Sequence, residues 1–68
     1  MTWKPQSWRD VWPGQDWMMP DGDVVHVGAV MSDGTERHAL CTLSDGGCLH
    51  IPATVLFDMA TFKKDRYR

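Results

Sequence analysis

The chain has no long apolar run and no marked excess of charge of either sign. None of its apolar stretches exceeds four residues, whereas a helix that crosses a bilayer needs about 20. Seven Lys and Arg stand against nine Asp and Glu, which gives a net charge of −2, so the overall field does not by itself attract nucleic acid. A helical membrane protein is excluded, and the charge count points to no partner.

Signals for secretion and for disulfide bonding are also scarce. The first ten residues contain neither the apolar stretch of about 7–15 residues nor the small-residue cleavage site of a secretory signal. We therefore expect a cytoplasmic location. In that compartment the two cysteines, Cys41 and Cys48, are expected as free thiols or metal ligands rather than as a disulfide.

A chain of 68 residues is expected to form one domain, covering 1–68. A core of this size contributes about 3–5 kcal/mol without additional support. A bound metal, a partner or a second copy of the chain is therefore a natural source of further stability.

The segment 1–22 is rich in tryptophan and proline. It holds all four tryptophans and three of the four prolines. Because proline restricts helices and central strands, we predict an irregular segment that covers the rest of the fold. Ser7 and Asp10 have the spacing of a helix cap, which predicts one helical turn ended by Pro13-Gly14.

From residue 23 the pattern changes to short strands separated by turns with Asp-Gly. Residues 24–31, 36–43 and 48–51 predict a three-stranded meander within 23–52. The segment 53–62 is ambiguous between helix and strand, with a short helix favoured, and 63–68 is a basic tail.

Loops of two residues at both Asp-Gly turns would pair Ser32 with Thr35 and Ser44 with Gly47. In that register both faces of the meander are largely apolar, so both need covering. We predict a mainly β fold, either a small SH3-like barrel or a β-meander of three to five short strands, with the segment 1–22 as its cover.

The same register gives a candidate metal site. It places His26, Cys41 and His50 side by side on adjacent strands, with Cys48 one diagonal step away. Two imidazoles and two thiols form a ligand set that structural zinc takes. The alternative is that the cysteines are small core residues and the histidines lie at the rim. Both interpretations depend on the register.

The tryptophans are candidates for partner recognition, because tryptophan is enriched at the centres of interfaces. We expect Trp12 and Trp17 to lie nearest the barrel, and Trp3 and Trp8 to be partly exposed. The predicted partner-binding residues are Trp3, Trp8, Trp17, Met18 and Met19. The same tryptophans would also serve as a cover over the sheet.

The basic tail interleaves aromatic and cationic side chains, as nucleic-acid readers do. The predicted nucleic-acid contacts are Lys63, Lys64, Arg66 and Arg68, and the alternative is a solvated chain end. For catalysis, the sequence has no Gly-x-Ser-x-Gly motif. A Cys41–His50 dyad lacks an orienting third group, so no enzymatic activity is expected.

The layout Trp8, Pro13-Gly14-Gln15-Asp16-Trp17, Asp21-Gly22, two Asp-Gly turns, Ile51-Pro52, Leu56-Phe57, Phe62 and Tyr67 resembles small accessory proteins encoded by bacteriophages and prophages. The resemblance implies a small β-barrel that binds a host protein, in some cases as an inhibitor of bacterial defence systems. It also implies that the host cytoplasm is the location.

Together these observations predict a non-enzymatic binding module that occludes a protein partner. Two alternatives remain open. One is a nucleic-acid-binding module stabilised by zinc, and the other is a structural protein that associates with itself, as a homodimer. No cofactor other than zinc is predicted.

Overall fold

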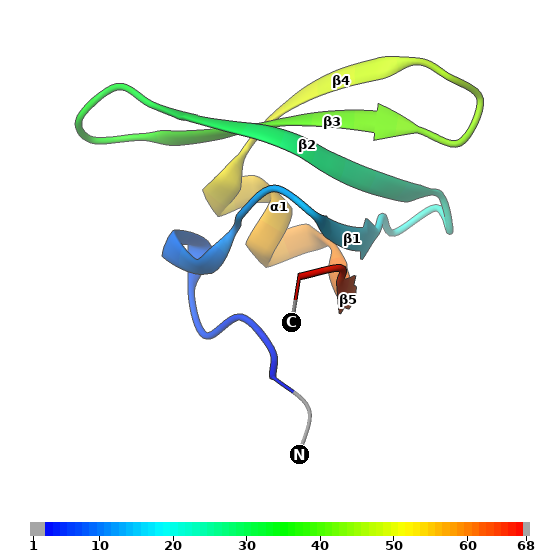
Figure 1. Cartoon of the computed structure of the whole chain (residues 1–68), viewed down its shortest axis with the longest axis horizontal. Coiled ribbons are helices and arrows are strands. Elements are labelled where there is room, and N and C mark those ends of the chain that lie inside the picture. Colours follow the sequence, from blue (N-terminus) through cyan, green and yellow to red (C-terminus); the bar gives the residue numbers. More distant parts are fainter. Residues whose placement is uncertain (1–2, 68) are drawn as a thin grey trace.

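The structure is a computed structural model, which describes residues 3–67 and contains one antiparallel sheet of five strands (Figure 1). The elements are η1 (Trp8–Asp10), β1 (Gln15–Met18), β2 (Val24–Ser32), β3 (Arg37–Leu43), β4 (Cys48–Pro52), α1 (Ala53–Met59) and β5 (Thr61–Asp65). The strand order is β4-β3-β2-β1-β5. The predicted mainly β class with one short helix is confirmed.

The core lies between the inner face of the sheet and α1. Figure 1 shows α1 beneath the β2–β3–β4 meander, where it connects β4 to β5. Strand β5 lies next to β1, on the side of β1 that faces away from β2. Ala53 and Leu56 of α1 are fully buried. The other buried apolar residues are Val11, Trp17, Val25, Val27, Ala39, Cys41 and Ile51.

The N-terminal segment contributes an interior strand, so the prediction that it holds no central strand is wrong. Strand β1 pairs with β2 on one side and with β5 on the other. Pro13 and Pro20 both lie outside its four residues, so every residue of the strand keeps its backbone donor. The predicted helical turn is confirmed as η1, where Ser7 Oγ accepts from the Arg9 N–H at 3.2 Å.

The C-terminal residues are also more ordered than a solvated tail. Lys63 and Lys64 belong to β5, which pairs with β1 through a bulge after Asp16. Phe62 packs its ring against Trp17, with 5.5 Å between the ring centroids. Burial of this aromatic pair stabilises the pairing of β5 with β1.

Both hairpin registers differ from the predicted ones. The β2–β3 loop has four residues, 33–36, so Ser32 pairs with Arg37 rather than Thr35. The Asp33 N–H donates to the Glu36 carbonyl at 3.1 Å, and the Glu36 N–H donates to Asp33 Oδ1 at 3.0 Å. These bonds close the hairpin around Gly34-Thr35 rather than around Asp33-Gly34.

The β3–β4 loop has three residues, 44–46, and the Leu43 N–H donates to the Gly47 carbonyl at 2.7 Å. Gly46 takes a φ of 92°, which suits the left-handed position of such a loop. In β2 the register with β3 shifts between Val27 and Ala29. These shifts direct Cys41 into the core, where it is 1% exposed.

The buried side chain of Gln15 joins four parts of the fold. Its Oε1 accepts from the Trp12 N–H at 3.0 Å and from Trp17 Nε1 at 3.1 Å. Its Nε2 donates to the Asp10 carbonyl at 2.7 Å and lies 3.4 Å from Asp65 Oδ2. A fully buried amide is stable only with such partners. Gln15 therefore fixes η1, the loop before β1, the Trp17 indole and the end of β5 relative to one another.

We expect Gln15→Leu to lower the free energy of unfolding by about 3 kcal/mol, because it leaves two N–H donors and one carbonyl without partners. Urea denaturation followed by tryptophan fluorescence measures this. Gln6→Leu is the control, since Gln6 is exposed, and its expected effect is within about 0.5 kcal/mol. Equal losses for the two variants would contradict the role assigned to Gln15.

Candidate functional site

A surface hollow of about 330 Å³ is lined by Trp12, Pro13, Asp65 and Tyr67. Trp12 and Pro13 come from the loop between η1 and β1, and Asp65 and Tyr67 come from the end of β5 and the residues after it. The hollow therefore joins two segments that are far apart in sequence. We call it the Trp12 hollow.

Trp12 is held in a defined orientation although 47% of it is exposed. Its backbone N–H donates to Gln15. The Arg37 guanidinium carbon lies 4.2 Å from the centroid of the indole ring, a distance typical of cation–π contact. Arg37 Nε in turn donates to the Val11 carbonyl at 2.9 Å. The indole is thus ordered before any partner arrives.

Tyr67 lies against the backbone of Gly14. A Cβ at position 14 would come within 2.4 Å of the Tyr67 ring, and Gly14 has a φ of 96°. A larger residue there would therefore strain the backbone and displace the ring. The Gly14 N–H donates to the Val27 carbonyl at 2.8 Å, and the Arg66 N–H donates to the Gly14 carbonyl at 2.9 Å. These bonds attach the residues after β5 to the loop that carries Trp12.

An ion-pair group supports the same segment from the neighbouring strands. Asp16 is 5% exposed, and its Oδ1 lies 2.7 Å from His26 Nδ1 and 3.4 Å from Arg66 Nη2. Arg66 Nη2 also lies 3.0 Å from His26 Nδ1. Because a buried carboxylate needs a cation or donors, this group holds Arg66 next to β1 and thereby positions Tyr67.

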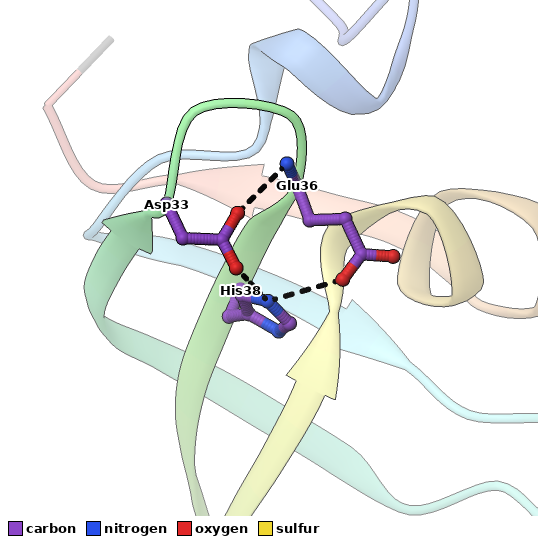
Figure 2. Close-up of side chains that lie close together, drawn as sticks. All are labelled: Asp33, Glu36 and His38. Carbon is purple, nitrogen blue, oxygen red and sulfur yellow. Dashed lines mark hydrogen bonds and ion pairs between the residues drawn. The ribbon is translucent and has the colours of Figure 1, made fainter.

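A second cluster lies in the β2–β3 hairpin (Figure 2). His38 Nε2 lies 3.4 Å from Glu36 Oε2 and 3.7 Å from Asp33 Oδ2. The hydrogen bond from the Glu36 N–H is the main cause that holds the pKa of Asp33 below its usual value, and the charge of His38 lowers this pKa further. The three ligand atoms lie within 4.8 Å of one another, as they would around a metal ion.

The surroundings of His38 lack one feature of a metal site. A metal-bound histidine normally donates its second ring nitrogen to an acceptor, and the buried Nδ1 of His38 has no hydrogen-bond partner. The cluster closes the four-residue loop. Sequence reasoning missed it because the predicted turn, centred on Asp33-Gly34, does not place Asp33 opposite Glu36.

The predicted Cys and His ligand set is not brought together by the structure. The register pairs His26 with Thr42, and Thr42 with Cys48, whereas Cys41 pairs with Val27 and Leu49. Successive residues of a strand point to opposite faces, so Cys41 faces the core and His26 and Cys48 face the other way. His50 packs instead against His38, with 4.9 Å between ring centroids. The physical reason is the shift of register at both hairpins.

Burial also separates the two cysteines chemically. Both are free, Cys41 buried and Cys48 exposed. Burial raises the pKa of the Cys41 thiol to about 11, which keeps it protonated at neutral pH. This is the opposite of what the Cys41–His50 dyad would need, since a nucleophilic cysteine requires a lowered pKa.

The predicted partner-binding residues lie in different environments. Trp17 is 2% exposed and belongs to the core, so its assignment to a binding surface is wrong. Trp12 was expected near the barrel and is instead the exposed tryptophan among the described residues. Strand β1 begins at Gln15, three residues after Trp12. Gln15 and Trp17 lie two residues apart in this strand and therefore point to the same, buried side.

The remaining predicted residues are only partly accessible. Trp3 contacts Phe62 with 5.8 Å between ring centroids, Trp8 packs against the core, and Met18 and Met19 are half-buried. Of the predicted nucleic-acid contacts, Lys63 and Lys64 are exposed on β5. Arg66 is paired with Asp16, and Arg68 lies outside the described residues.

Comparison of the chain with protein-family models, with curated proteins and with solved structures finds no match. Within residues 3–67, no helix has the length and apolar character needed to cross a membrane. The features of the chain that bear on function are thus its own residues, above all those of the Trp12 hollow.

We expect one thiol of the folded protein, Cys48, to react with a disulfide reagent at pH 8, and both to react in denaturant. With the Cys41 pKa at about 11, its thiolate fraction at pH 8 is about one thousandth. Intact-mass spectrometry counts the modified thiols, and Cys48→Ser is the control that should leave the folded protein unmodified. Rapid double modification of the folded protein would contradict the burial of Cys41.

Gly14→Ala should displace Tyr67 and disrupt the Trp12 hollow. Gly34→Ala is the matched control, because Gly34 has a φ of 104° and nothing within 4 Å of an added Cβ. Both variants should lose about 1–2 kcal/mol of stability from the positive φ. Only Gly14→Ala should also change the Tyr67 ring resonances in an NMR spectrum. Unchanged Tyr67 resonances in Gly14→Ala would show that the ring does not lie against Gly14.

Proposed function

We propose that this protein is a small non-enzymatic binding domain that recognises a protein partner through the Trp12 hollow and acts by occluding the partner's surface. The observation that carries the proposal is an exposed tryptophan held in place from within the chain by Arg37 and Gln15. An ordered indole with half of its surface in solvent is the kind of side chain that anchors protein interfaces.

The composition of the hollow supports a protein partner. Trp, Tyr and Arg are the residue types most enriched at the energetic centres of protein interfaces. Trp12 and Tyr67 line the hollow, and Arg37 lies against the Trp12 ring. Tryptophan and tyrosine supply large contact areas with few rotatable bonds. Because the indole is already fixed, little conformational entropy is lost on binding.

The strand order supports an SH3-like barrel as the finer description of the fold. A β1–β2–β3–β4 meander is followed by a short helix, and β5 returns to pair with β1. In this arrangement the Trp12 loop and the residues after β5 lie side by side, since the Arg66 N–H donates to Gly14. The relationship to phage accessory proteins stays a prediction that rests on the sequence resemblance alone.

The nucleic-acid alternative has less support. Among the described cations of the predicted contact set, Arg66 is engaged with Asp16 and His26, which leaves the neighbouring pair Lys63 and Lys64. Two phosphate contacts give weak binding that salt readily removes. The zinc set that accompanied this alternative is divided between the two faces of the sheet.

Trp12→Ala should abolish capture of the partner while it leaves the fold intact. The immobilised protein is exposed to bacterial lysate, and bound proteins are identified by mass spectrometry. Met31→Ala is the control, because Met31 is a large exposed side chain, 58% accessible, that does not line the Trp12 hollow. The supporting result is a protein bound by the wild type and Met31→Ala but not by Trp12→Ala. If every bound protein is retained equally by Trp12→Ala, the proposal fails.

A further inference from the structure

The sheet has two edges, and they differ in charge. Strand order places β4 at one edge and β5 at the other. Strand β5 carries Lys63, Lys64 and Asp65, whereas β4 has the sequence Cys-Leu-His-Ile-Pro with no carboxylate, lysine or arginine. Charged residues, lysine above all, are the usual protection of an edge strand against pairing with another chain. β5 has that protection along its length, whereas β4 has only a proline, Pro52, at its end.

The β4 edge is also accessible. Within the described part of the chain, β4 pairs with β3 alone. Cys48, Leu49 and His50 are exposed. Figure 1 shows the strand as the outermost element on its side of the molecule. Its outward backbone groups are therefore open to a further strand.

Apolar hollows lie on both faces next to this edge, and Leu49 lines both. One, of about 420 Å³, is also lined by Leu40, Cys48 and His50 on the outer face. The other, of about 400 Å³, is also lined by Met19, Leu43 and Met59 on the inner face. Leu40 and Leu49 are 37% and 41% exposed. Extending the sheet at β4 would remove apolar surface from water on both faces.

We infer that β4 pairs antiparallel with β4 of a second copy of this chain, which joins the two sheets across a twofold axis. A strand that pairs with an uncharged, apolar edge is expected to be uncharged and apolar itself. In residues 3–67, β4 is the unpaired edge strand that meets this condition. Pairing with itself brings no like charges together along the strand, and the net charge of −2 adds little repulsion between copies. A twofold contact needs only one self-complementary surface.

This dimer is independent of the proposed function. The Trp12 hollow is built from the loop before β1 and the residues after β5, and β5 is the opposite edge of the sheet from β4. Loss of the dimer would therefore leave capture of a partner by a single copy intact. Loss of the Trp12 hollow would likewise leave the dimer intact.

The test is sedimentation equilibrium of the untagged protein over a concentration series, under reducing conditions so that Cys48 forms no disulfide. The wild type should show a monomer–dimer equilibrium. Leu49→Lys and His50→Lys should each be monomeric at every concentration, because each adds the charge that β4 lacks. Val55→Lys is the control, since Val55 is similarly exposed, at 39%, but lies on α1. It should dimerise as the wild type does, and circular dichroism should show that all variants are folded.

A charge-swap experiment distinguishes pairing of β4 with itself from a general effect on solubility. Leu49→Lys and Leu49→Glu should each be monomeric alone, and an equimolar mixture should give a heterodimer in native mass spectrometry. A wild type that is monomeric throughout the series would overturn the inference. Dimerisation of Leu49→Lys and His50→Lys equal to that of Val55→Lys would also overturn it, because the dimer would then use another surface.

Discussion

The hydrogen bonds of the Gln15 amide are the constraint on which the rest of the structure depends. The amide is fully buried and reaches η1, the Trp12 loop, the Trp17 indole and β5. No apolar side chain can replace it, because each of these groups would lose its partner in a region without water. A single side chain thus couples the core tryptophan, Trp17, to the exposed one, Trp12.

Trp17 shows how much of this small core depends on β1. Burial of an indole removes about 150–250 Å² from water, which corresponds to about 4–6 kcal/mol. That is comparable to the whole net stability expected of a domain of this length. Phe57 of α1 and Phe62 of β5 both pack against the Trp17 ring. The strand that carries Trp17 is therefore central to stability even though it is only four residues long.

Local patterns in the sequence predict the parts of the fold that depend on neighbouring residues. The cap at Ser7, the meander from residue 24 and the short helix after Pro52 follow from residue spacing and turn chemistry. The hairpin registers do not, because the position of the β2–β3 turn depends on the Asp33–Glu36 hydrogen bonds. The shift of register between Val27 and Ala29 has one sign in the sequence, which is a glycine, Gly28, inside a strand pattern. A shift of one residue reverses which side chains face the core, and this is why Cys41 is separated from His26.

The exposure of Trp12 cannot be predicted from the sequence for a related reason. The choice between Trp12 and Trp17 as the buried indole depends on where β1 begins, and β1 is specified partly by β5, whose residues lie almost at the other end of the chain. The signals that could have located the hollow are the Gly14 position and the aromatic Tyr67. They acquire meaning only once the two segments are known to be adjacent.

The pairing of β1 with β5 also has a consequence for the order of folding. The β2–β3–β4 meander consists of contacts between neighbours in sequence and can form early, whereas the β1–β5 ladder closes a loop that joins Gln15 to Asp65 and bears a large entropic cost. During synthesis, the β1–β5 ladder cannot form until residues 61–65 have been added. Until then Trp17 lacks Phe62, and a nascent chain exposes its most apolar side chain next to an unprotected strand edge. That interval is when this protein is most open to aggregation or to capture by a chaperone.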